Sequence, residues 1–286
     1  FRRGYVARMA ALRTGSPEGA PHEILDPRDL KYCRNLCTAR WAESDDPFRW
    51  RESIPLARWG LAETLCMSLP LIVLICLPAV VWPRFWWAGL PLVPLLYWVF
   101  YFFRDPRRIV PADRDAVVAP ADGKIAEIVK LDHDPFLDSP AVRIGIFLSI
   151  FNVHINRSPW PAQAVELRYS PGLFLNALNP DSAIRNENMW IGLQENAPPY
   201  RRMVVRQIAG LFARRIVCQI RPGEHLDRGE KFGMIKLGSR TELILPDEPG
   251  LVIEVEVGQK IHAGSTVMAR FPLDPAADHP REVANP

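Results

Sequence analysis

The sequence lacks a regular cysteine framework and an excess of charge of either sign. Its five cysteines are an odd number without the spacing of disulfide-stapled secreted domains. The 35 Lys and Arg against 32 Asp and Glu leave a net charge of +3, which excludes a strongly basic nucleic-acid-binding protein and an acidic disordered chain. There is no internal repeat and no phosphate-binding glycine loop. What remains is a chain of 286 residues with no nucleic-acid partner, long enough for one large or two ordinary domains.

Metal ligands are also scarce. Cys33 and Cys37 have a C-x3-C spacing, but no second pair or nearby histidine completes a ligand set. We therefore expect no metal. Residues 1–60 are interpreted as a polar arm, rich in Arg and Pro, in which the two cysteines lie on a short cytosolic helix.

Two long hydrophobic runs follow this arm. Residues 65–82 (LCMSLPLIVLICLPAVVW) and 85–103 (FWWAGLPLVPLLYWVFYFF) carry no charge, and each approaches the ~20 residues that span a bilayer. Seven of the nine tryptophans lie between Trp41 and Trp98, where several resemble interfacial anchors. The pattern predicts a two-helix transmembrane hairpin over residues 61–103. A buried core hairpin and a shallow re-entrant hairpin are the alternatives.

The charges beside the two runs predict an orientation. Arginines flank the pair on both sides, at Arg49, Arg51, Arg58, Arg104, Arg107 and Arg108, whereas the connecting turn holds Arg84 alone. Positive charge favours the cytoplasmic side of a membrane. We therefore expect both ends of the pair, and the domain that follows it, on the cytoplasmic side of the cell membrane.

The pattern changes again after Phe103. Residues 104–286 contain short apolar runs broken by Gly, Pro and Asp, such as VRIGIFLSI, TELILP and LVIEVEV. Runs of this length separated by turns predict strands. The fold class expected is α+β, a mostly β domain with one or two helices, preceded by the transmembrane hairpin.

Three polar residues in apolar surroundings are the candidates for chemistry. Asp122 lies in a Pro-Ala-Asp-Gly turn, His154 ends an apolar strand, and Ser239 follows Gly238. Each has an ordinary structural interpretation as a turn residue, a buried histidine or a loop pair. Together they could form a triad of orienting acid, base and nucleophile. The residues alone leave open a membrane-anchored Ser-His-Asp hydrolase and a non-catalytic membrane adaptor.

Five blocks in order resemble the phosphatidylserine decarboxylase family. They are YFFRDPRRIVP, APADGKI, FLSIFNVHINRSP, VRQIAGLFARRIVC and EKFGMIKLGSRTELILP, and they cover residues 101–271, nearly two thirds of the chain. The resemblance implies an autocatalytically processed lyase that converts phosphatidylserine to phosphatidylethanolamine and CO2. A related serine lipid such as archaetidylserine stays open as the substrate.

The resemblance also implies roles for the three residues and a cofactor. Ser239 would attack the carbonyl of Gly238, His154 would take the hydroxyl proton, and Asp122 would hold the imidazole. The chain would split between 238 and 239 and leave a pyruvoyl group on residue 239. That group would form a Schiff base with the substrate amine and act as an electron sink. The fragments 1–238 and 239–286 would stay together as a heterodimer through strand pairing.

Three local features qualify this resemblance. Arg240 follows the serine where longer family members have threonine, which is similar to the short bacterial type with a G-S-R site. Phe151 replaces the first histidine of an H-x-x-H pair found in some members. The segment His262-Ala263-Gly264-Ser265-Thr266 looks like a second processing site, but its surroundings predict a strand, a turn and a strand, so Ser239 is preferred.

One further segment is ambiguous. Asn186-Glu187-Asn188 follows a loop that in the family lies near the substrate mouth, and a solvated turn is the alternative.

Overall fold

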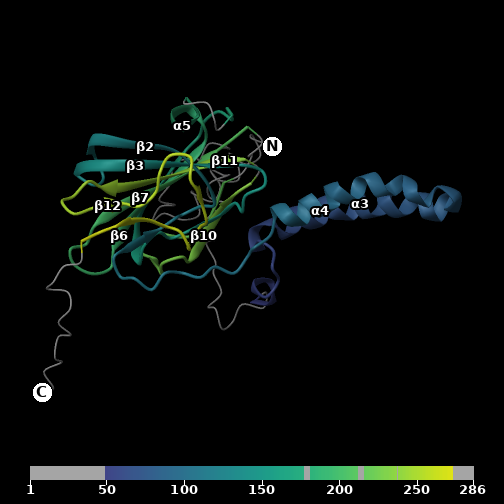
Figure 1. Cartoon of the computed structure of the whole chain (residues 1–286), viewed down its shortest axis with the longest axis horizontal. Coiled ribbons are helices and arrows are strands. Elements are labelled where there is room, and N and C mark those ends of the chain that lie inside the picture. The colour runs from purple at the N-terminus through teal and green to yellow at the C-terminus, as the bar shows by residue number, and fades with distance from the viewer. Residues whose placement is uncertain (1–48, 177–180, 212–215, 237, 273–286) are drawn as a thin grey trace, which may run out of the picture. The chain divides into compact units, whose positions relative to one another are not determined.

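The computed structural model describes residues 49–176, 181–211, 216–236 and 238–272 of the chain. Helices come first along this part of the chain and strands follow (Figure 1). Most of the polar arm predicted over residues 1–60, including Cys33 and Cys37, lies outside the described residues.

The helices are concentrated before residue 103. They are the 3₁₀ helices η1 (Arg49–Glu52), η2 (Arg58–Gly60) and η3 (Pro83–Leu92), the α-helices α3 (Leu61–Val81) and α4 (Val93–Phe102), and the short α5 (Ser182–Arg185). Two consecutive helical arms, α3 and then η3 with α4, therefore form where the sequence predicts two apolar helices, over residues 61–103. The first begins at Leu61, four residues before the charge-free run, and Thr64 in its first turn donates a hydrogen bond to the carbonyl of Gly60.

The second arm is not a single α-helix. Pro83 starts it, Pro91 lies inside it, and Phe85 has non-helical dihedral angles, so its first half is wound as 3₁₀ helix. The two arms approach closely at Gly89, where a Cβ atom would lie 2.2 Å from the carbonyl oxygen of Ile75. A small residue at this crossing lets the two backbones approach each other, as is common between membrane helices.

Both arms are long and apolar enough to cross a bilayer. The segments Arg58–Val81 and Pro83–Phe102 have 24 and 20 residues, and only 11% and 17% of their most apolar stretches are buried within the protein. Large side chains such as Leu65, Val80 and Trp82 are exposed. This exposure contradicts the alternative of a buried core hairpin and agrees with lipid contact.

The rest of the described chain is mostly β. Its strands are β1 (Ala116–Val118), β2 (Gly123–Asp134), β3 (Ser139–Leu148), β4 (Ile155–Arg157), β5 (Ala162–Ser170), β6 (Asn188–Glu195), β7 (Arg202–Ala209), β8 (Ile216–Cys218), β9 (His225–Leu226), β10 (Lys231–Ile235), β11 (Ser239–Pro246), β12 (Val252–Ile253), β13 (Lys260–Ile261) and β14 (Val267–Arg270). The α+β prediction is confirmed to this extent: two helical arms, then a mostly β domain.

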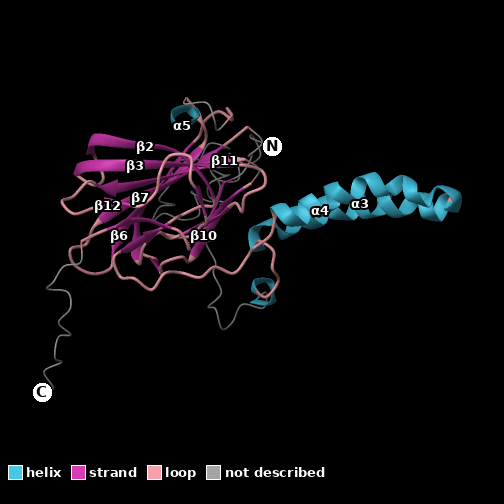
Figure 2. Ribbon diagram, in the orientation of Figure 1, coloured by secondary structure: helices cyan, strands magenta, loops and turns pink. Residues whose placement is uncertain are grey.

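A curled eight-stranded antiparallel sheet forms the body of this domain (Figure 2). Its strand order is β13-β2-β3-β11-β7-β6-β5-β9, and two three-stranded sheets, β1-β14-β12 and β4-β10-β8, complete it. The apolar run TELILP forms most of β11, a central strand paired with β3 on one side and β7 on the other. The LVIEVEV run, in contrast, forms strand only at Val252–Ile253.

The ends of the helical arms pack against the β domain. A buried cluster joins residues of the arms to β4, β8 and β10: Ala57, Val99, Phe102, Phe103, Val153, Ile155, Val217 and Met234. Backbone hydrogen bonds from Ala57 to Phe103 and from Asp105 to Pro55 tie the two ends of the hairpin together. The base of the hairpin therefore packs directly beside the segment that contains His154.

Candidate active site

The main sheet brings distant segments of the chain to one of its ends. Ser239, the first residue of β11, lies opposite Leu148, the last residue of β3. The next strand, β2, pairs Lys124 with Phe147, so Asp122 just before β2 reaches the same end. Neighbouring strands lie ~4.8 Å apart, which places the backbone of Asp122 about 10 Å from that of Ser239. Pairing of the strands thus assembles the predicted residues in one region.

Ser239 is a buried hydroxyl without a partner. Its residue is fully buried, and within the described part of the chain its Oγ makes no hydrogen bond. Gly238 before it has φ +67°, in the left-handed region that favours glycine. A Cβ at Gly238 would meet nothing nearer than Ile150 at 4.0 Å, so the dihedral angle rather than space requires glycine here.

His154 contacts the backbone next to Ser239. Its Nε2 accepts a hydrogen bond of 3.2 Å from the N–H of Gly238, and its Nδ1 lies 2.9 Å from the carbonyl oxygen of Asn152. These partners assign the proton to Nδ1 and leave the lone pair on Nε2. The ring also lies against Phe102 of α4, with centroids 4.6 Å apart.

Burial sets the protonation state of His154. The side chain is fully buried, which lowers its pKa from 6.5 to about 4; the nearby charge of Arg104 lowers it further, while the Asn152 carbonyl and Asp122 oppose the shift. A neutral imidazole with its lone pair on Nε2 is the form a general base needs.

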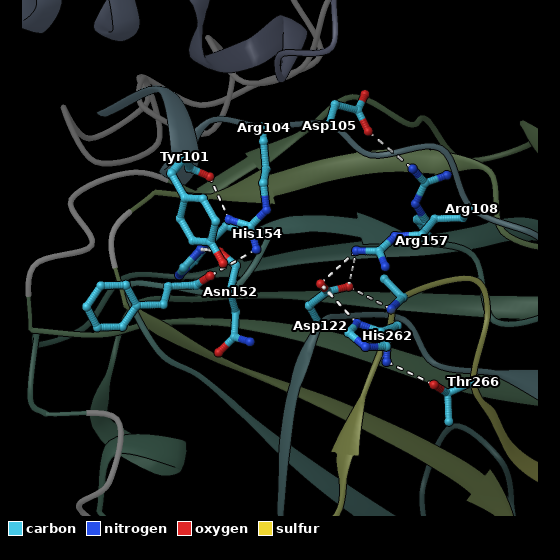
Figure 3. A network of polar contacts seen from close by, with 12 residues as sticks. Tyr101, Arg104, Asp105, Arg108, Asp122, Asn152, His154, Arg157, His262 and Thr266 are labelled. Carbon is cyan, nitrogen blue, oxygen red and sulfur yellow. Dashed lines mark hydrogen bonds and ion pairs between the residues drawn. The ribbon is translucent and has the colours of Figure 1, made fainter. Parts of the chain in front are cut away.

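Asp122 has a different environment from the one predicted. Arg108 donates to both of its carboxylate oxygens, at 2.8 and 2.7 Å, and the N–H of Ala263 donates to Oδ1 at 2.8 Å (Figure 3). The Nδ1 of His262 lies 3.6 Å from Oδ2. Among the described residues no hydrogen bond joins Asp122 to His154. The contact that orients the imidazole comes from the Asn152 carbonyl, and Asp122 acts on the ring through its charge alone.

Gly210 touches the peptide bond between Gly238 and Ser239. It follows β7, and a Cβ there would lie 2.4 Å from the carbonyl oxygen of Gly238 and 2.9 Å from its carbon. Only glycine therefore fits beside this peptide bond. The signal in the sequence was a glycine ending an apolar strand, which is too common to single out.

The segment Asn186-Glu187-Asn188 supports the same end of the sheet. Asn186 is fully buried, and its amide donates to the carbonyls of Ala209 at 2.7 Å and Leu175 at 2.9 Å. The solvated-turn interpretation is therefore wrong. Because Ala209 lies opposite Ser239 in the sheet, Asn186 holds the strand that flanks Ser239.

Arg240 anchors β11 from within. Its Nε donates to Glu242 at 2.9 Å, and its Nη2 donates to Glu127 of β2. All three are parts of one ion-pair network, to which Arg206 also contributes through Glu242. The arginine of the G-S-R motif thus has a structural role in fixing the start of this strand.

The turn around Ser265 is an ordinary connection. His262 and Thr266 close it through hydrogen bonds, including the one from the N–H of His262 to Thr266 Oγ1 at 2.9 Å. It lies between β13 and β14, as the sequence predicted.

Among the described residues no group of three or more His, Cys, Asp or Glu could hold a metal.

Comparison with known proteins gives a consistent result. The sequence model of a family described as phosphatidylserine decarboxylase matches residues 95–269. A protein of Rhodopirellula baltica named phosphatidylserine decarboxylase proenzyme is 52% identical over 243 residues, covering 85% of this chain and 99% of its own. Proteins of the same name from Nitrosomonas eutropha and Carboxydothermus hydrogenoformans are 45% and 42% identical, each over 65% of this chain and 84% and 85% of their own.

Proposed function

The chain belongs to the phosphatidylserine decarboxylase family, and we propose that, as a decarboxylase proenzyme of that family, it splits its own backbone between Gly238 and Ser239. The reaction it catalyses is the conversion of phosphatidylserine to phosphatidylethanolamine and CO2. The observation that carries the cleavage proposal is the buried Ser239 hydroxyl without a partner, one residue from the N–H that binds His154.

The first step requires His154 to change partners. In the uncleaved chain its Nε2 accepts the N–H of Gly238, and a shift to the Oγ of Ser239 lets it take the hydroxyl proton. The Oγ then bonds to the carbonyl carbon of Gly238, and the amide nitrogen of Ser239 leaves with that proton. The charge of Asp122, held by Arg108, stabilises the imidazolium formed in between.

Elimination completes the cleavage. Loss of the α-proton of residue 239 and rupture of its Cβ–Oγ bond release the Gly238 carboxylate, and water replaces the nitrogen, which leaves as ammonia. The described residues suit the formation of a pyruvoyl group at this position, because Ser239 is buried and no hydrogen bond holds its Oγ away from the carbonyl of Gly238. A pyruvoyl group there supplies the carbonyl electron sink for loss of CO2. His154 is the group placed to return a proton to the substrate carbon.

Strand pairing supports a lasting complex of the two fragments. After cleavage, β11 would belong to fragment 239–286, while β3 and β7 on either side belong to fragment 1–238. Nearly all of β11 is buried. We propose a heterodimer of these two fragments held by the central strand of the sheet.

The same proposal includes the membrane. The two apolar arms would cross the bilayer as a hairpin, with the flanking arginines and the β domain on the cytoplasmic side. The substrate would then reach the site by diffusion in the membrane.

Intact-mass measurement of the purified chain tests the cleavage proposal. We expect fragments of 238 and 48 residues, about 27 and about 5 kDa of the 32.5 kDa chain. The smaller fragment should be lighter by one ammonia molecule than the same fragment beginning with serine. An intact chain whose Ser239 is labelled by a fluorophosphonate would instead indicate a hydrolase, and an intact unlabelled chain an adaptor.

Gly210→Ala tests the fit at the scissile bond. The added methyl group would overlap the carbonyl of Gly238, a backbone group that cannot swing aside. An overpacking cost of about 1–3 kcal/mol corresponds to cleavage about 5- to 150-fold slower, measured as the fraction of split chain against time. Leu211→Ala is the control, because Leu211 is exposed beside it. Cleavage of Gly210→Ala at the wild-type rate would contradict the assigned geometry.

A further inference from the structure

Arg104 is the first charged residue after the second apolar run, and its side chain is held without a counter-charge. Its Nη1 donates to the carbonyl of Tyr101 at 2.6 Å and its Nη2 to the carbonyl of Phe151 at 3.0 Å. The guanidinium also stacks on the ring of Tyr101, 3.7 Å from its centroid. In the described chain these neutral groups are its partners, and no carboxylate pairs with it.

Of the three charged residues that closely follow Arg104, two are paired and the third, Arg107, is exposed. Asp105 pairs with Arg157 and Lys231, and Arg108 pairs with Asp122. A guanidinium has five N–H donors, and the two carbonyls leave several of them unused. Arg104 is thus a cation in a fixed position with unused N–H donors. Such a group can bind a planar or tetrahedral oxyanion.

This cation lies at the reaction site. The Phe151 carbonyl that it binds is in the turn between Ser149 and Asn152, whose last carbonyl holds His154. Figure 3 shows the Arg104 side chain beside both Tyr101 and His154. Its positive charge contributes to the lowered pKa of His154, after the larger effect of burial. An anion bound by Arg104 would therefore be close to residue 239.

The chemistry of the substrate selects which anion this is. Phosphatidylserine carries a carboxylate, which departs as CO2, and a phosphate, which is unchanged by the reaction. A cation on the departing carboxylate would stabilise the ground state and oppose its loss. A cation on the phosphate binds the substrate and the transition state equally, so it does not slow the loss of CO2.

We propose that Arg104 binds the phosphate of the phospholipid substrate and holds the headgroup over residue 239. This inference rests on the proposed function and names the phosphate-binding residue of the same site. The position of Arg104 at the end of α4 places the guanidinium at the level where headgroups lie if the hairpin crosses the bilayer.

The test compares Arg104→Met with Arg107→Met on dihexanoyl phosphatidylserine, used as a soluble monomer so that binding to a membrane surface does not enter. Arg107 is an exposed arginine three residues further along the chain, which makes it a matched control. We expect Arg104→Met to raise KM about 10- to 100-fold with a smaller change in kcat, as for a lost hydrogen bond to a charged group. Arg107→Met should stay within about twofold of wild type.

Inhibition by dihexanoyl phosphatidylethanolamine separates phosphate from carboxylate. This product keeps the phosphate and lacks the carboxylate, so Arg104→Met should weaken its inhibition by the same factor. Weakening confined to phosphatidylserine would overturn the proposal, as would an unchanged KM.

Fragment formation is followed on a gel for every variant. Arg104→Lys keeps the charge and should give an intermediate KM. If neither Arg104 variant splits, Arg104 acts in maturation and the proposal is overturned. The same conclusion follows if Arg104→Lys splits and its KM equals that of the wild type. Failure of the wild-type chain to split would instead reject the cleavage mechanism, whatever the behaviour of Arg104.

Discussion

Ser239→Ala is expected to leave the chain as a single uncleaved band and to abolish decarboxylation. The variant lacks the Oγ that attacks the carbonyl of Gly238, and nothing else at the site replaces it. Because Oγ makes no hydrogen bond among the described residues, its removal breaks no hydrogen bond, and the fold should persist. A denaturing gel and a lipid-product assay measure the two effects.

Ser265→Ala is the matched control for this experiment. Ser265 also follows a glycine with positive φ, Gly264 at +72°, but it lies in the closed turn between β13 and β14. We expect this variant to split as the wild type does. A split Ser239→Ala together with an unsplit Ser265→Ala would reverse the assignment of the processing site.

His154→Gln should have the next largest effect. Glutamine can still hydrogen bond within the site, but it cannot accept the proton of Ser239. Loss of a general base lowers rates by about 10²–10⁴-fold, so unsplit chain should accumulate in freshly synthesised protein. His133→Gln is the control, because the side chain of His133 is 56% exposed on β2. Rapid splitting of His154→Gln would show that another group is the base.

The pH profile of cleavage provides an independent check on His154. Because burial lowers its pKa to about 4, the imidazole is neutral throughout pH 6–8, and the rate should be flat there and fall towards pH 4. A half-maximum near pH 6.5 would indicate a solvated ring. In the unfolded chain this histidine has its ordinary pKa of 6.5, so the unfolded state binds the proton first as the pH falls. The free energy of unfolding should therefore be unaffected by this group above pH 6.5 and should decrease by about 3 kcal/mol between pH 6.5 and pH 4.

The residues proposed as nucleophile and base were easier to find in the sequence than the groups that support them. Ser239 and His154 could be found because each side chain is unusual in its apolar surroundings. The group that orients His154 is a main-chain carbonyl, that of Asn152, and no residue type marks a carbonyl. The pairing of Asp122 with Arg108 depends on the approach of a loop to the start of β2, which spacing does not reveal.

Gly210 and the hairpin show two further limits of the sequence. Gly210 is required by a peptide bond that lies 28 positions away in the sequence, so only the pairing of β7 with β11 exposes the requirement. Charge-free composition predicted both apolar arms. It did not predict that prolines and the non-helical Phe85 would wind the start of the second arm as 3₁₀ helix.

If the chain is cleaved before Ser239 as proposed, the position of this residue at the start of β11 would make unfolding of the mature molecule difficult to reverse. Before the cut, β11 inserts between β3 and β7 as part of the same chain, at the high effective concentration of a tethered segment. After the proposed cleavage, the same insertion would be a bimolecular encounter between separate polypeptides. A mature molecule that unfolds must then find its partner by diffusion, so its lifetime is governed by the rate at which the central strand is lost.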